Sequence, residues 1–140
     1  MVSPPLISVV EDDDSVRESL KGLIRSVGLE VEVFPSAEKF LDSDQSNSTR
    51  CLILDVRMPG MGGLELQRRL LKSNRDIPII FITAHGDKAA RSQALKDGAA
   101  GYLFKPFSEQ ALLNAINTAL GVGVAKNANR IGLVVKEEIA

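Results

Sequence analysis

The stretch PIIFIT at residues 78–83 is the clearest strand signal in the chain, because four consecutive apolar residues, three of them β-branched, lie between Pro78 and Thr83. A run that is apolar throughout is typical of a strand buried on both faces of a parallel sheet. Further short strand-like runs lie at Leu6–Val10, Glu30–Phe34, Cys51–Leu54 and Gly101–Phe104. The sequence therefore predicts five short strands.

Segments with apolar residues at helical spacing follow these runs. The first helix carries Val16, Leu20, Leu23, Ile24 and Val27, with Gly28 as a stop signal. Ser36 is a good N-cap for a helix from Ala37 to about Leu41, whereas residues 42–50 are polar, lack periodicity and predict a loop. The third helix is marked by Leu64, Leu70 and Leu71, the fourth spans about Lys88–Lys96, and the last is marked by Leu112, Leu113, Ile116 and Leu120.

Short strands that alternate with helices of this length predict an α/β fold, with a parallel sheet covered by helices on both faces. Right-handed crossovers leave few topologies, and five strands suit the flavodoxin-like (βα)5 order 2-1-3-4-5. In that order the chain reverses direction between strands one and three. Ligand chemistry is then expected at the carboxyl ends of those two strands.

The composition excludes several classes of protein. A length of 140 residues suits one domain, and 17 basic against 18 acidic residues leave no basic excess for direct binding of nucleic acid. The lone Cys51 rules out an internal disulfide and fits a reducing compartment. No apolar run reaches the roughly 18 residues that span a bilayer, and the start lacks a signal-peptide pattern. We therefore expect a cytoplasmic protein.

Polar residues mark the carboxyl ends of four predicted strands. Glu11 and Asp12 end the first strand, Asp55 the third, Thr83 the fourth and Lys105 the fifth. Because the carboxyl ends of parallel strands meet at one edge of a sheet, we expect these side chains to lie together.

Three carboxylates repel one another unless a cation lies between them. An oxygen-only cluster selects a hard cation, and Mg2+ with retained waters is the natural candidate. The alternative for Glu11–Asp14 is a solvated acidic turn or a helix start favoured by the macrodipole, and Asp13 and Asp14 suit that role. The position of Asp55 at the adjacent strand end favours a metal site for Glu11 and Asp12.

Two further strand-end residues have a structural and a functional interpretation. Lys105 balances the charge of the acids and is also suited to hold a phosphoryl oxygen. Its bond to Pro106 is one of the few in the chain at which a cis peptide is reasonable. Thr83 suits the end of a strand, and its hydroxyl is also suited to bind an oxygen of a group on Asp55.

Four motifs in this order resemble the receiver domain of two-component response regulators, over about Leu6–Leu120. The matching stretches are Val9–Asp13, Leu54–Met61, Ile82–Ala84 and Gly101–Phe107. Each stretch alone is weakly specific, but four at the ends of the right strands are highly specific. The stretch Thr83-Ala84-His85-Gly86-Asp87 is similar to receivers of the FixJ type, which usually precede a helix-turn-helix output domain.

The resemblance implies that Asp55 is the phosphoacceptor and that the donor is a phosphohistidine on a sensor histidine kinase. It implies a Mg2+ site formed by Asp12 directly, by Glu11 through water, by Asp55 and by the backbone carbonyl of Arg57. Glu11 departs from the more usual Asp, and we expect altered metal affinity rather than loss. Like other receivers, the chain would assist its own phosphorylation and dephosphorylation without being an enzyme on other substrates.

The resemblance further implies that Thr83 and Lys105 bind the phosphoryl oxygens. If Thr83 moves toward the phosphoryl group, Tyr102 is placed to fill the space behind it; the alternative for Tyr102 is an ordinary half-buried strand aromatic. The fourth helix carries Ala89, Ala90 and Ala94 with Leu95 as its one large apolar residue, so it should pack weakly and move. We expect the switch to act on the face of the fourth helix, fifth strand and fifth helix, with a homodimer on phosphorylation as a hypothesis.

His85 is the only histidine, and either acts as a general base toward an acyl phosphate, tunes access to the site or faces solvent. A haloacid dehalogenase-like phosphatase would carry an Asp where Arg57 stands, two residues after the nucleophile. A flavodoxin-like cofactor binder would need a phosphate-cradling loop where this chain has four acids. A receiver-like docking module that takes no phosphate remains the alternative function.

We expect a receiver unit over residues 1–120 and a linker or C-terminal tail over residues 121–140. The tail contains two glycines before residue 130 and is too short for a helix-turn-helix domain. The chain would therefore signal to a partner protein, or a DNA-binding output domain has been lost from it. No binding to a membrane is expected.

Overall fold

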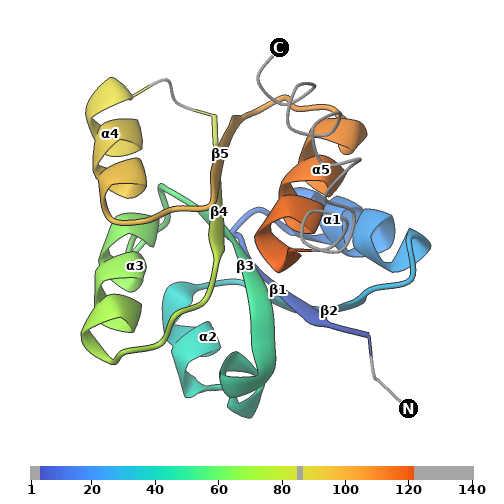
Figure 1. Cartoon of the computed structure of the whole chain (residues 1–140), viewed down its shortest axis with the longest axis horizontal. Helices are drawn as coiled ribbons and strands as arrows, with labels where there is room; N and C mark the ends of the chain where they lie inside the picture. The colour runs from blue at the N-terminus through green and yellow to red at the C-terminus, as the bar shows by residue number, and fades with distance from the viewer. Residues whose placement is uncertain (1–3, 85–86, 122–140) are drawn as a thin grey trace.

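The computed structural model describes residues 4–84 and 87–121, and these form one sheet with helices on both sides (Figure 1). The strands are β1 (Leu6–Val10), β2 (Glu30–Phe34), β3 (Thr49–Asp55), β4 (Ile79–Thr83) and β5 (Gly101–Phe104). The helices are α1 (Asp14–Ser26), α2 (Ala37–Asp42), α3 (Gly63–Lys72), α4 (Lys88–Lys96) and α5 (Glu109–Leu120), with a 3-10 turn at Asp44–Ser48.

The predicted sheet is confirmed. All pairings are parallel and the strand order is β2-β1-β3-β4-β5, so β1 and β3 are neighbours at the point where the chain reverses direction. Every residue of β1 and β4 is buried, as expected for strands covered on both faces. The carboxyl ends of β1, β3, β4 and β5 therefore lie along one edge.

Two apolar layers hold the sheet between its helices. Helices α1 and α5 cover one face, where Leu20, Ile24, Leu112 and Ile116 pack on the strands. Helices α2, α3 and α4 cover the other face, and their core residues are Ala37, Phe40, Leu66, Leu70, Ala90 and Ala94. Figure 1 shows this separation, with α1 and α5 on the right of the sheet and α3 and α4 on the left.

Side-chain caps fix where four helices begin. Asp13, Ser36, Asp87 and Ser108 each accept hydrogen bonds from backbone N–H groups in the first turn of α1, α2, α4 and α5. These bonds satisfy donors that have no partner within a helix. The prediction of Ser36 as an N-cap is confirmed. Gly28 has a φ of 87°, a conformation that favours glycine, at the predicted stop after α1.

The predicted loop over residues 42–50 is only partly right. Asp44–Ser48 form a 3-10 turn and β3 already begins at Thr49. The turn is held by short polar side chains: Ser43 Oγ accepts from Gln45 N at 3.0 Å and Ser46 Oγ donates to the Ser43 carbonyl at 2.9 Å. Such local bonds leave no apolar periodicity in the sequence, so no pattern predicted the turn.

Several residues expected on the inner faces of helices lie outside. Val27 and Leu71 are each 48% exposed, Leu95 is 40% exposed and Ala89 is exposed as well. In α3 the buried face runs through Gly63, Leu66, Gln67 and Leu70 instead. Helix α4 is thus packed on the protein through Ala90 and Ala94, which strengthens the expectation of weak packing.

Among the described residues, no helix has the length and apolar character needed to cross a membrane. The predicted tail lies outside the described residues from position 122 onward, as does His85.

Candidate functional site

Lys105 connects two of the predicted strand-end carboxylates. Its Nζ donates to Glu11 Oε1 at 2.8 Å and to Asp55 Oδ2 at 3.3 Å. The Glu11 and Asp55 side chains are 1% and 9% exposed, and that of Lys105 is 21% exposed. Burial removes these charges from most of the water, so the hydrogen bonds must compensate for lost hydration. The Lys105–Pro106 bond is cis.

Asp12 completes a cluster of three carboxylates. One ligand oxygen each of Glu11, Asp12 and Asp55 lies within 4.8 Å of the others. Partial burial of its carboxyl, followed by the neighbouring Glu11 carboxyl, raises the pKa of Asp12. Three carboxylates thus face one ammonium, and the excess negative charge together with an all-oxygen donor set fits a hard divalent cation.

The protonated form of Lys105 is stabilised by its hydrogen-bond partners. Burial alone would lower the pKa of this amine, but the carboxylates of Glu11 and Asp55 outweigh burial and raise it. Lys105 therefore stays an ammonium at neutral pH and supplies a fixed positive charge beside Asp55.

The loop between β3 and α3 is folded back onto the end of β3. The N–H of Arg57 donates to Asp55 Oδ1 at 3.2 Å, and the N–H of Gly63 donates to the Val56 carbonyl at 3.0 Å. On the other side, Glu38 of α2 accepts a hydrogen bond from the N–H of Met61 at 3.0 Å. The pKa of Glu38 is lowered first by a hydrogen bond from its own backbone N–H and then by this one from Met61. The carboxylate of Asp55 is thereby oriented by the loop that follows it.

Asp13 and Asp14 play the structural roles expected of them. Asp13 caps α1 by accepting from the N–H groups of Ser15 and Val16, and the hydrogen bond from the Ser15 hydroxyl at 2.8 Å is the main cause of its lowered pKa. Asp14 pairs with Arg17, whose Nη1 also donates to the Glu11 carbonyl at 2.9 Å. Neither acid belongs to the carboxylate cluster.

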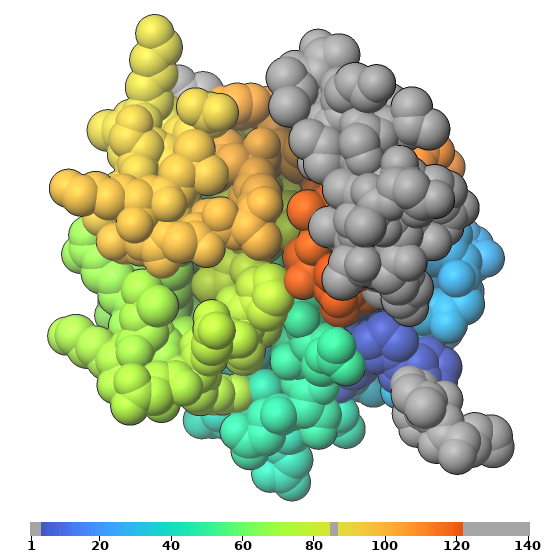
Figure 2. All heavy atoms as spheres, in the orientation of Figure 1, coloured from blue at the N-terminus to red at the C-terminus, as the bar shows by residue number. Residues whose placement is uncertain are grey.

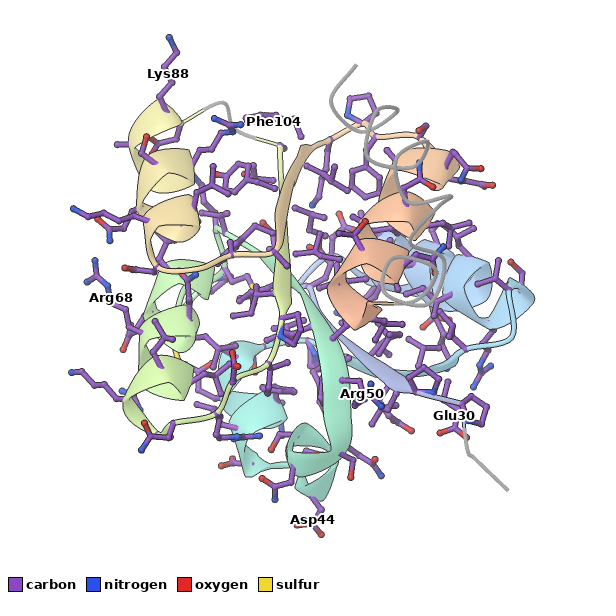
Figure 3. The ribbon with its side chains drawn as sticks, in the orientation of Figure 1. Glu30, Asp44, Arg50, Arg68, Lys88 and Phe104 are labelled. Carbon is purple, nitrogen blue, oxygen red and sulfur yellow. The ribbon has the colours of Figure 1, made fainter. Side chains whose placement is uncertain are left out.

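Thr83 ends β4, and Tyr102 lies on the neighbouring strand β5. Thr83 is 1% exposed, and its carbonyl accepts from the N–H of Lys105 at 2.7 Å. The Tyr102 ring packs against Phe81 at 5.9 Å and Phe104 at 5.4 Å between centroids, and its hydroxyl is buried without a partner among the described residues. Burial raises the pKa of Tyr102. Phe104 itself stands 44% exposed at the end of β5 (Figure 3).

Two connections near the site were not predicted from the sequence. The guanidinium of Arg57 pairs with Asp87, the N-cap of α4, at 3.4 Å. Gln67 of α3 is 2% exposed and its Nε2 donates to the carbonyl of Ala94 in α4 at 3.1 Å. In the sequence, the polar Gln67 falls within the apolar stripe of α3, and this position could have indicated a buried hydrogen bond. The Arg57–Asp87 pair joins two loops, so it leaves no periodic signal in the sequence.

The sequence of the chain matches a known family. The family model described as response regulator receiver domain matches residues 7–117. Nodulation protein W of Bradyrhizobium diazoefficiens is 52% identical over 114 residues, which are 81% of this chain and 50% of that protein. Response regulator protein TodT of Pseudomonas putida is 46% identical over 124 residues, 89% of this chain and 55% of that protein.

Solved structures agree with the sequence relatives. The crystal structure of FixJ-N has a TM-score of 0.76 and 36% identity, and the match covers 85% of this chain and 95% of that one. The present chain spans about half the length of the curated relatives it matches. The similarity therefore concerns the shared unit and leaves the remaining half of those proteins unmatched.

Proposed function

The chain belongs to the response regulator receiver domain family of two-component systems, and from this we propose that it is a phosphoacceptor with Asp55 as the residue that takes the phosphoryl group. The observation that carries the proposal is the shared hydrogen bonding of Lys105 with Glu11 and Asp55, at 2.8 and 3.3 Å. Through these hydrogen bonds a buried carboxylate, an ammonium and further carboxylate oxygens lie together at the carboxyl-end edge of the sheet.

The chemistry is a displacement at phosphorus. An oxygen of Asp55 attacks the phosphorus of a phosphohistidine on the kinase, so that an O–P bond forms while the N–P bond breaks. The electron pair of the broken bond stays on the imidazole nitrogen, and the ring departs neutral because its other nitrogen carries a proton. The product on Asp55 is an acyl phosphate.

The residues of this chain position the reacting groups. The N–H of Arg57 holds one oxygen of Asp55 at 3.2 Å, which orients the carboxylate for attack. The ammonium of Lys105 lies beside the other oxygen and is placed to bind a transferred phosphoryl oxygen, with the Thr83 hydroxyl as a second donor. Such positioning and charge neutralisation are most of what phosphoryl transfer needs from a protein.

The residues also fit a metal ion. Glu11, Asp12 and Asp55, with the backbone carbonyl of Arg57, would hold Mg2+. A bound Mg2+ would neutralise charge between the carboxylates and the incoming phosphoryl group. Because Glu11 already accepts from Lys105 and from the N–H of Asp13 at 3.0 Å, its contribution to the metal is best made through water.

The response is a population shift in the face formed by α4, β5 and α5. The phosphoryl group adds a charge of about -1.5 to -2 and new acceptor oxygens beside Thr83. A movement of Thr83 toward them changes the packing around Tyr102, which contacts Phe81 and Phe104 on either side. The altered face is then read by a partner or an output domain, or by a second copy of the chain.

The partners follow from the relatives. Those relatives include transcriptional regulatory proteins and response regulators about twice as long as the matched region, so a sensor histidine kinase upstream and an output domain downstream are the partners we propose. The division into a receiver unit over residues 1–120 and a tail over residues 121–140, and a cytoplasmic location, stay predictions.

The test is intact mass after incubation with acetyl phosphate and Mg2+. We expect one phosphate-sized gain in the native chain and none in Asp55→Asn or in a sample with the metal chelated. Circular dichroism of Asp55→Asn should match that of the native chain, so that loss of the gain is not loss of the fold. A folded native chain with no gain from acetyl phosphate or from a phosphorylated histidine kinase would favour the docking-module alternative.

A further inference from the structure

Arg57 touches the phosphoacceptor with one end and α4 with the other. Its backbone N–H donates to Asp55 Oδ1 at 3.2 Å, while its guanidinium Nη2 lies 3.4 Å from Oδ2 of Asp87. Asp87 uses its other oxygen, Oδ1, to accept from the N–H groups of Ala89 and Ala90 at 3.0 and 3.2 Å. A single residue therefore connects Asp55 to the carboxylate that caps α4.

The two ends of α4 are held differently. At its C-terminal end the carbonyl of Ala94 accepts from the buried Gln67 Nε2 at 3.1 Å and from the N–H of Ala99 at 2.9 Å, and Arg68 lies 3.8 Å from Asp97. Helices α3 and α4 lie side by side in Figure 2, and Figure 3 shows Arg68 on the outer side of α3. At the N-terminal end, the Arg57–Asp87 ion pair links α4 to the loop that follows Asp55.

We propose that the Arg57 guanidinium exchanges between Asp87 and a phosphoryl group on Asp55, and that this exchange transmits phosphorylation to the N-terminal end of α4. The inference rests on the proposed function, because it needs a phosphoryl group on Asp55. The inference adds to the proposed function the residue pair, Arg57 and Asp87, that couples Asp55 to α4.

The energies allow the exchange. The Arg57 and Asp87 side chains are 57% and 39% exposed, and ion pairs this accessible are weak, so the guanidinium leaves Asp87 at little cost. A phosphoryl group carries more charge than a carboxylate and offers oxygens in the geometry that a guanidinium binds bidentately. The buried Gln67–Ala94 hydrogen bond holds the other end of α4 in place, so a change at Asp87 moves the N-terminal end relative to it.

Asp87→Asn separates the ion pair from the cap. Asn is as good an N-cap as Asp, so the substitution removes the charge that Arg57 binds and keeps an acceptor for Ala89 and Ala90. Asp97→Asn is the matched control, since it removes one negative charge from the opposite end of α4, where Arg68 lies at 3.8 Å. A general effect of charge on anion affinity would be similar in both variants.

The experiment is a titration with beryllofluoride, a phosphoryl mimic formed from Be2+ and fluoride, in the presence of Mg2+ at low ionic strength. Binding is measured by calorimetry for the native chain, Asp87→Asn, Arg57→Gln, their double variant and Asp97→Asn. We expect Asp87→Asn to tighten binding about two- to fivefold, the range that an exposed ion pair supports, because Arg57 is then free for the mimic. In the Arg57→Gln background, Asp87→Asn should change the affinity no more than Asp97→Asn does.

Amide shifts give a second readout that a purely structural role would not produce. Beryllofluoride should shift the N–H resonances of Ala89 and Ala90 in the native chain, and this shift should shrink in Arg57→Gln although the mimic still binds. Equal effects of Asp87→Asn with and without Arg57, or an equal effect of Asp97→Asn, would overturn the exchange while leaving the phosphoacceptor intact. A folded native chain that binds no beryllofluoride, or binds it equally well as Asp55→Asn, would overturn both proposals.

Discussion

Gly63→Ala tests whether the loop after Asp55 is as tightly folded as the structure shows. Gly63 begins α3 and is buried against the end of β3. A Cβ on this residue would lie 2.4 Å from the carbonyl oxygen of Asp55, 3.1 Å from Phe81 Cε1 and 3.1 Å from Val56 Cα. Two of these three contacts are backbone atoms, which cannot rotate away as a flexible side chain would.

The expected cost follows from these distances. The closest contact must lengthen by about 1 Å to reach an ordinary separation, and forcing a methyl group into a packed site costs about 1–3 kcal/mol. Displacement also weakens the Gly63 N–H bond to Val56, which contributes about 1 kcal/mol. The better helix propensity of Ala returns about 0.5–1 kcal/mol. The net loss is about 1–3 kcal/mol, or about 4–12 °C in melting temperature for a domain of this size.

The assay is thermal and urea unfolding followed by far-UV circular dichroism. Gly22→Ala is the control: it lies within α1, a Cβ there meets nothing within 4 Å, and it should stabilise by about 0.5–1 kcal/mol. The two substitutions are chemically identical and should move the melting temperature in opposite directions. A Gly63→Ala variant that melts with or above the native chain would refute the tight loop and, with it, the orientation of Asp55 by Arg57.

Two further predictions use single reporter residues. Burial raises the pKa of the Cys51 thiol to about 12. At pH 8 native Cys51 should therefore react with iodoacetamide about a thousandfold more slowly than in urea, and mass spectrometry showing rates within tenfold of each other would contradict the buried thiol. Tyr102 is the only tyrosine in a chain without tryptophan, so tyrosine emission reports its surroundings directly. Phosphorylation or beryllofluoride should change that emission, and Thr83→Ala should reduce the change while the mimic still binds; an undiminished change would disconnect Tyr102 from Thr83.

The fold and the core of the site were predictable because both follow from short-range patterns. Buried parallel strands are apolar throughout, and their carboxyl ends must share an edge, so Glu11, Asp55 and Lys105 were expected together and lie within hydrogen-bonding distance. The 3-10 turn before β3 was missed because polar side chains stabilise it locally. Which face of a helix is buried was predicted less well, as Leu71 and Leu95 show. Spacing alone does not say which of several apolar residues points inward.

The contacts that escaped prediction are those between loops. Arg57 and Asp87 are thirty positions apart and belong to segments whose conformations are set by their flanking strands. Glu38 reaches Met61 across a similar gap in sequence. Hydrophobic periodicity carries no information about such pairs, because a charged residue is equally compatible with any exposed loop position. Only the spatial arrangement of the strand ends brings them together.

The difference in packing between α4 and α5 explains why a change in charge at Asp55 should act on α4. Helix α5 buries Leu112 and Ile116 completely, and each such side chain contributes about 1.5–3 kcal/mol of hydrophobic free energy. Helix α4 buries Ala90 and Ala94, whose methyl groups contribute about 0.8 kcal/mol each. An exposed ion pair worth about 0–1 kcal/mol is negligible against the first pair and comparable with the second. The same exchange of Arg57 that would leave α5 in place is therefore large enough to shift the position of α4.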